Sequence, residues 1–171
     1  MGVFDLSALQ WWLRGWRPKY CRMVNGIDTF AGAELGPVPA RVPGSVQNAL
    51  RDAGVIPDWR IGLNSRLCEW IEHREWQFST EIPAGWVHNG EKVLLDAHGL
   101  DYSGSVYVDG REVGTFQGTL LPHRFDLTPW LTDGAAHRLH ILFDEPPPEQ
   151  GQCGYTSESR FFKPRYPYSW D

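Results

Sequence analysis

The chain has 171 residues, a formal net charge of −5 and a hydrophobic content of 42%, and it includes nine Trp. This length fits one domain, and so many aromatic and apolar residues argue against a disordered chain. The acidic balance argues against a nucleic-acid backbone as a partner, and no apolar run approaches the roughly 20 residues that a membrane helix needs.

One helix is expected near the start of the regular structure. Ser45 is a favourable N-cap residue, and Gly54 is a favourable residue just after a helix end. Between them lies an apolar stripe at helical spacing, formed by Val46, Ala49, Leu50 and Ala53. A second helical turn is expected at 128–131, where Pro129 would occupy the first position.

The rest of the chain predicts β-strands. The stretch 70–82 reads as β structure and alternates in its second half, and the dipeptide Asp109-Gly110 between two apolar runs predicts a hairpin turn. Further strands are expected at 93–97, 105–108, 111–114, 124–127 and 137–143. Strands every 8–12 residues with turn residues between them are typical of an antiparallel sandwich.

The C-terminal region changes character. Pro146-Pro147-Pro148 ends the last strand, since Pro cannot continue a hydrogen-bonded ladder. Residues 161–171 are dense in aromatic side chains, whereas a free terminus is normally polar. We therefore expect 146–171 to be an extended loop and tail that leads toward further domains of a longer chain.

Eight short segments resemble, in chain order, the β-mannosidase-type enzymes of glycoside hydrolase family 2. They are RVPGSV at 41–46, AGVIPD at 53–58, IGLN at 61–64, EWIEHREW at 69–76, GLD at 99–101, VYVDG at 106–110, FDLT at 125–128 and KPRYPYSWD at 163–171. The chain departs from the family pattern at Asp109 and in the Pro-Tyr-Ser of the last segment, so the sugar stays open. A β-mannoside leads, followed by a β-galactoside and a β-glucuronide.

The resemblance implies an all-β fold, an antiparallel jelly-roll β-sandwich of the galactose-binding-domain-like type with one or two short helices. Residues 1–171 would form the single N-terminal domain of a larger retaining glycoside hydrolase, of the β-mannosidase or β-galactosidase type. Its partners would be a β-glycoside in the full-length enzyme and an intramolecular catalytic barrel, with no nucleic acid and no membrane. This domain alone would not be an enzyme.

The resemblance also names the site residues. Trp170 and Asp171 match a Trp-Asp pair that reaches the glycone subsite of the barrel, with Arg165 and Tyr168 as supporting residues. A carboxylate accepts hydrogen bonds from two neighbouring hydroxyls, and an indole offers an apolar face to the C–H side of a sugar. The alternative is that these side chains only pack a domain interface.

No catalytic residue is expected in the chain itself. Retaining hydrolysis needs two carboxyl groups roughly 5–5.5 Å apart, which family 2 enzymes place on the barrel. Glu69, Glu72 and Glu75 are interpreted as solvated strand charges. His137 and His140 would point to opposite faces of a strand, so no metal site is expected, and no cofactor.

The cysteines and the N-terminal residues bear on the cellular compartment of the protein. The three cysteines include no CxxC pair, and the first residues lack a basic segment followed by an apolar one, so a reduced, cytoplasmic protein is predicted. Two rivals remain: a stand-alone carbohydrate-binding module, and a purely structural domain that supports the barrel.

Overall fold

The computed structural model describes residues 2–88, 90–118 and 121–146. Within these ranges, eight strands form a six-stranded sheet in the order β2-β1-β3-β8-β5-β6 and a two-stranded sheet, β4-β7, all antiparallel. The strands are β1 Trp11–Trp16, β2 Leu35–Ala40, β3 Glu75–Ile82, β4 Leu94–Ala97, β5 Ser103–Val108, β6 Arg111–Gln117, β7 His123–Asp126 and β8 His137–Phe143. The predicted all-β antiparallel fold is confirmed.

The helices are few and short, as predicted. They are α1 Tyr20–Met23, α2 Val46–Asp52 and two 3-10 helices, η1 Leu6–Ala8 and η2 Asn64–His73. The capping of α2 follows the sequence: Ser45 Oγ accepts a hydrogen bond from the Asn48 amide at 3.2 Å, and Gly54 has a φ of +71°.

Two sequence expectations need correction. The first part of the stretch 70–82, predicted as β, belongs to η2 through His73, and β3 begins only at Glu75. Residues 128–131 form a hydrogen-bonded turn that is not assigned as a helix. The predicted hairpin is confirmed, because β5 and β6 pair directly across Asp109 and Gly110, which have φ values of +47° and +77°.

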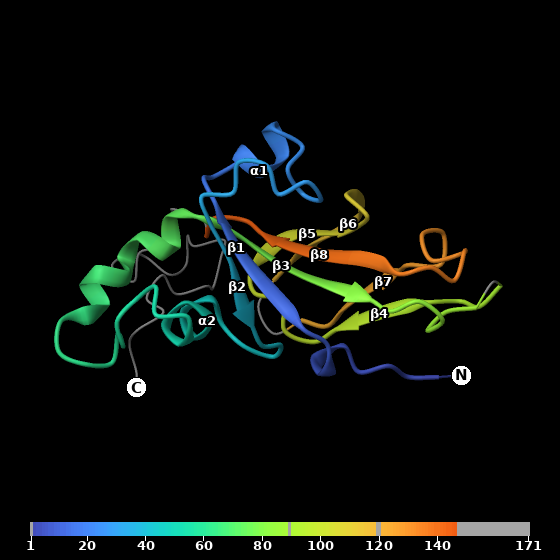
Figure 1. The fold of residues 1–171 in the computed structure, drawn as a ribbon, viewed down its shortest axis with the longest axis horizontal. Coiled ribbons are helices and arrows are strands. Elements are labelled where there is room, and N and C mark those ends of the chain that lie inside the picture. Colours follow the sequence, from blue (N-terminus) through green and yellow to red (C-terminus); the bar gives the residue numbers. More distant parts are fainter. Residues whose placement is uncertain (1, 89, 119–120, 147–171) are drawn as a thin grey trace, which may run out of the picture.

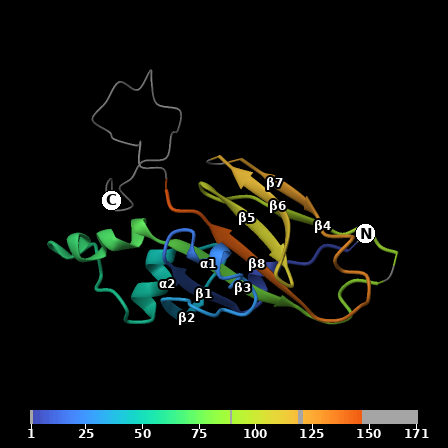
Figure 2. The ribbon, with the colours of Figure 1, turned by 90° about the horizontal axis from the view of Figure 1, so that it is seen from above.

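The main core lies between the two sheets. In Figure 1, α2, β4 and β7 lie on one side of the six-stranded sheet. Figure 2, seen from above, shows β4 and β7 toward the β6 edge of that sheet and α2 toward the β2 edge. Side chains alternate along the strands, so one face of each strand points into this core. Its buried members include Trp11, Leu13, Phe78, Leu139, Ile141 and Val106 of the large sheet, Leu95 and Phe125 of the small sheet, and Leu50 of α2.

Part of the opposite face of the large sheet is covered by residues 17–34, which include α1 (Figure 1). A second buried cluster joins the two, and it consists of Trp16, Cys21, Ile27, Tyr107 and Leu142. The Gln77 side chain bridges the layers, since its Oε1 accepts from Trp16 Nε1 at 3.0 Å and its Nε2 donates to the Ile27 carbonyl at 2.6 Å. The chain itself therefore covers one face of the large sheet and part of the other, where Trp12 stays 39% exposed.

Candidate functional site at the end of β8

The four site residues predicted from the sequence, Trp170, Asp171, Arg165 and Tyr168, lie outside the described residues. Their role therefore stays a prediction. The structure describes the end of the sandwich that precedes these residues in the chain, where β8 ends at Phe143. The start of β3 and the segment 17–34 meet at this end (Figure 1).

Arg22 links three strands of the large sheet at this end through hydrogen bonds. Arg22, at the end of α1, donates from Nη1 to Glu75 Oε1 at 2.9 Å and from Nη2 to Asp144 Oδ1 at 2.9 Å and Ser105 Oγ at 3.2 Å. Burial lowers the pKa of Arg22, but the neighbouring Tyr107, Asp144 and Glu75 outweigh burial, so that the pKa lies above its usual value. The guanidinium thus joins the start of β3, the start of β5 and the residue that follows β8.

The glutamates differ from the solvated strand charges that the sequence suggested. Glu69 and Glu72 lie on η2, whereas Glu75 is only 3% exposed. Burial raises the pKa of Glu75, and Arg22 counteracts part of that rise. A raised carboxyl pKa is typical of a general acid, but burial and the contact with Arg22 keep Glu75 from any substrate. Glu75 therefore serves the architecture of this end.

A small hollow lies beside this cluster. It has a volume of about 150 Å³ and is lined by Gly15, Glu34, Leu35, Trp70 and Arg74. The two oxygens of Glu34 accept from Arg17 Nε at 3.0 Å and from Arg74 Nε at 2.7 Å, and the Arg17 hydrogen bond is the main cause that lowers the Glu34 pKa. Ligand pockets usually measure about 300–1,000 Å³, so this hollow is too small to enclose an ordinary ligand.

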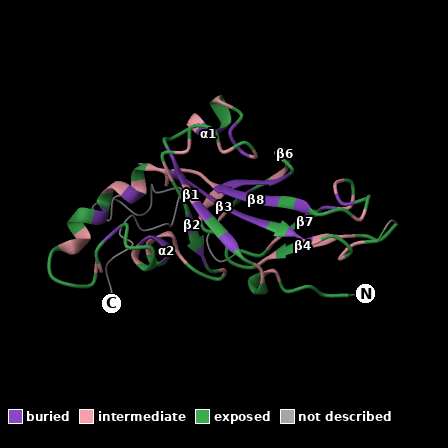
Figure 3. Ribbon diagram, viewed as in Figure 1, coloured by how far each residue is buried: buried purple, intermediate pink, exposed green. Residues whose placement is uncertain are grey.

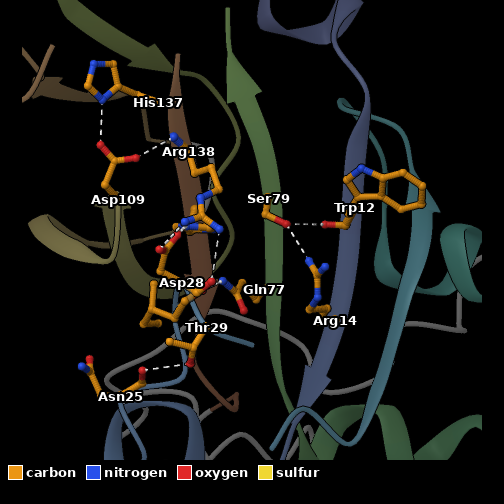
Figure 4. A network of polar contacts seen from close by, with 12 residues as sticks. Trp12, Arg14, Asn25, Asp28, Thr29, Gln77, Ser79, Asp109, His137 and Arg138 are labelled. Carbon is orange, nitrogen blue, oxygen red and sulfur yellow. Dashed lines mark hydrogen bonds and ion pairs between the residues drawn. The ribbon is translucent and has the colours of Figure 1, made fainter. Parts of the chain in front are cut away.

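A second polar network fastens the segment 17–34 to the sheet (Figure 4). Asp28 accepts from Arg138 Nη2 at 2.6 Å and lies 3.1 Å from His140 Nε2. Burial lowers the pKa of His140 despite the neighbouring carboxylate. The guanidinium of Arg14 lies 3.6 Å from the Phe30 ring centroid, a cation–π contact that adds a further attachment. These contacts hold the covering segment against the sheet.

The two histidines of β8 have separate partners. His137 lies between two carboxylates, with Nδ1 2.7 Å from Asp109 and Nε2 2.8 Å from Asp133, whereas His140 contacts Asp28. Across residues 2–88, 90–118 and 121–146, no group of three or more His, Cys, Asp or Glu residues is arranged to hold a metal ion. Each histidine is thus engaged in fastening loops.

The thiols that the structure describes, Cys21 and Cys68, are buried and unbonded to sulfur. Burial and, secondarily, the charge of Glu75 raise the pKa of Cys21 to about 12, so this thiol stays protonated and unreactive at neutral pH. The helices in the described ranges include none that is long and apolar enough to cross a membrane.

Comparison with known proteins gives the site its context. A family model described as glycosyl hydrolase 2 galactose-binding domain-like matches residues 23–171. A β-mannosidase B of Emericella nidulans is 27% identical over 184 aligned residues, which cover 100% of this chain and 21% of that protein. A β-mannosidase B of Aspergillus clavatus is 32% identical over 108 residues, which cover 63% of this chain and 13% of that protein.

Solved structures share the fold. The crystal structure of a β-D-mannosidase from Dictyoglomus thermophilum aligns with a TM-score of 0.67 and 20% identity, over 85% of this chain and 16% of that chain. A β-glucuronidase from Ruminococcus gnavus aligns with a TM-score of 0.54 and 19% identity, over 80% of this chain and 20% of that chain. The chain therefore spans about a fifth or less of the length of these proteins.

Proposed function

Because the chain belongs to the galactose-binding domain-like family of glycosyl hydrolase 2, we propose that it is a non-catalytic accessory domain of a larger retaining glycoside hydrolase. In this proposal the domain docks against a catalytic barrel and lends Trp170 and Asp171 to its glycone subsite. The observation that carries the proposal is the family match over 23–171 together with relatives of which the chain covers only 13–21%.

The proposed substrate is a β-glycoside, with a β-mannoside as the first choice. Relatives with the name β-mannosidase support this choice, and the fold alone is shared with a β-glucuronidase. Asp171 would accept hydrogen bonds from two neighbouring sugar hydroxyls, which are stronger when the acceptor is charged. Trp170 would cover the C–H face of the ring. Arg165 and Tyr168 are proposed as supporting residues, with Arg165 orienting the carboxylate of Asp171.

The test is Asp171→Ala in the parent polypeptide, assayed with an aryl β-mannoside. We expect kcat/KM to fall by about 10²-fold or more, the loss found when a positioned polar group that acts on the transition state is removed. Glu112→Ala, at an exposed position of β6, is the matched control and should keep full activity. An unchanged kcat/KM for Asp171→Ala, or a stop codon directly after Asp171, would contradict the proposal.

A stand-alone carbohydrate-binding module is the second candidate, and the hollow beside Trp70 is the observation in its favour. Isothermal titration of the 171-residue chain with methyl β-mannoside and methyl β-galactoside separates the two proposals. An accessory domain carries only part of the subsite, so we expect no binding tighter than millimolar. Micromolar binding that is lost in Trp70→Ala would favour the module instead.

A further inference from the structure

A short loop, residues 132–136, lies directly before β8, at the end of the sandwich where β3 ends (Figure 1). In Figure 3, β8 is mainly buried, whereas the loops at this end are mostly exposed or intermediate. Two polar contacts attach the loop to neighbouring parts of the described structure. Asp133 Oδ1 lies 2.8 Å from His137 Nε2, and the Gly134 carbonyl accepts from the Gly85 amide at 3.1 Å. The His137 ring therefore helps to fix the position of the loop.

The His137 ring lies between two carboxylates. Its Nδ1 is 2.7 Å from Oδ2 of Asp109, in the β5–β6 turn (Figure 4), and its Nε2 faces Asp133 on the other side. An imidazolium ring carries a hydrogen on both nitrogens, whereas a neutral ring has one donor and one acceptor. Both contacts are therefore hydrogen bonds at the same time only while His137 is protonated. Once the ring is neutral, one of the two carboxylates faces a nitrogen lone pair, and the two repel each other.

The two carboxylates differ in how firmly they are fixed. Asp109 Oδ1 also accepts from the Arg138 amide at 2.8 Å, and the Asp109 amide donates to the Arg138 carbonyl at 2.9 Å. Asp133 accepts a further hydrogen bond at 2.9 Å from the Ala135 amide, which belongs to the same loop, and its side chain is 63% exposed. The neutral His137 ring thus keeps its hydrogen on Nδ1, toward Asp109. Asp133 is the carboxylate that turns to water.

Asp109 and Asp133 are the charged groups that face the ring. Burial lowers the pKa of His137, but the hydrogen bonds to these carboxylates outweigh burial, so that the ring loses its proton above the usual pKa near 6.5. Burial also acts against ionisation of the carboxylates, but their hydrogen bonds outweigh it and lower both pKa values, so they stay ionised through this range. Arg138, beside His137, pairs with Asp28 of the segment 17–34 at 2.6 Å. The further charged residues at this end are Glu81 of β3, Arg111 and Glu112 of β6, and His88 and Glu91 of the loop after β3.

We propose that His137 is a pH-sensitive switch for the loop: as an imidazolium ion it holds Asp133 and the loop in place, and as a neutral ring it releases both. In the held state, a crevice between residues 82–87 and 131–137 leaves no room for a water molecule, and its walls include Pro83, Val87 and Leu131. Release of the loop opens this mostly apolar crevice and frees the Gly85 amide from the Gly134 carbonyl.

The test measures solvent exchange of the Gly85 amide by NMR in the 171-residue chain at about pH 6 and about pH 8.5, corrected for the intrinsic pH dependence of exchange. A hydrogen bond to a charged group changes an equilibrium constant by about ten- to hundredfold. We therefore expect the protection of Gly85 to fall at least about tenfold between the two pH values. Over the same range, the nitrogen-15 signals of the His137 ring should show that Nε2 loses its hydrogen and Nδ1 keeps it.

Asp133→Asn is the matched variant, because a carboxamide can accept from a protonated Nε2 and donate to an unprotonated one. Gly85 should therefore stay protected at both pH values in this variant. His88→Gln is the control, since His88 is an exposed titratable residue in the same loop as Gly85. This control should show the same fall in protection as the wild type.

Several results would overturn the inference. Equal protection of Gly85 at both pH values in the wild type would show that the loop stays in place when the ring is neutral. A fall that persists in Asp133→Asn, or that disappears in His88→Gln, would assign the pH dependence to another group. Loss of hydrogen from Nδ1 in place of Nε2 would show that Asp109 is the carboxylate released. Amides of β8 that lose protection together with Gly85 would show that the whole domain opens.

Discussion

Arg22→Met tests whether the polar cluster at the end of β8 holds this part of the molecule together. The substitution keeps the unbranched apolar stem of the side chain but removes the donors to Glu75, Asp144 and Ser105. Glu75 then remains as a buried carboxylate without its cation. Breaking a buried ion pair from one side costs about 3–5 kcal/mol. Because 36% of the Arg22 side chain is exposed and water can reach the vacated space, we expect about 3 kcal/mol.

The assay is urea unfolding of the 171-residue chain followed by tryptophan fluorescence. In a thermal melt, the same loss of about 3 kcal/mol would lower the melting temperature of a chain of this size by about 6–12 °C. Arg22→Met/Glu75→Met is the matched control, since it removes the buried charge along with its partner and should recover most of the loss.

The same variant has a predictable pH dependence. Burial raises the pKa of Glu75 in the folded state, so its contribution to stability is complete below the pKa of the unfolded chain and is lost as pH rises through the folded pKa. Without Arg22 the folded pKa rises further. The deficit of Arg22→Met should therefore be smaller at pH 5 than at pH 7.5. A loss below about 1 kcal/mol at pH 7.5, or a loss that is the same at both pH values, would refute the reasoning.

Two further predictions concern the sheet. Gly104→Ala should destabilise the chain by about 2–3 kcal/mol in urea unfolding, because the added Cβ would collide with the Leu142 carbonyl oxygen and lie 2.6 Å from Phe116 Cζ. A urea midpoint equal to that of the wild type would show that β5 can shift to make room for the methyl group. Burial opposes protonation of His137, but the hydrogen bonds that its ring donates to Asp109 and Asp133 outweigh the effect of burial and raise the pKa of His137. The stabilising contribution of His137 is therefore complete below the unfolded pKa near 6.5 and is lost as pH rises through the folded pKa. The stability difference between wild type and His137→Gln should thus grow from pH 8 to pH 6, and a constant difference would count against that ion pair.

Local patterns in the sequence predicted the elements whose form depends on near neighbours. The alternation over 137–143 predicted β8 with its bounds, and Asp109-Gly110 predicted the hairpin, since positive φ at both turn residues is a local demand. The cap at Ser45 predicted the start of α2 in the same way.

Elements that depend on distant partners were missed. No strand was predicted at 35–40, where Pro37 and Pro39 argue against one, but β2 is an edge strand paired only with β1 and tolerates them. Glu75 was expected to be solvated. Its burial depends on the ion pair with Arg22, which is 53 positions away in the chain and so leaves no local pattern. The subsite role of Trp170 and Asp171 came only from the family resemblance and stays a prediction.

The segment 17–34 has a consequence for anyone who wishes to redesign this domain. Many sandwiches offer a broad flat sheet as a platform for new recognition, but here Asp28, Gln77 and Ile27 bind that platform to its own cover. Substitutions on the sheet face beneath residues 17–34 would first weaken the contacts of that segment and lower stability, before a new ligand could bind. Engineering should therefore start from the loops at the rim, where changes leave the two packed layers undisturbed.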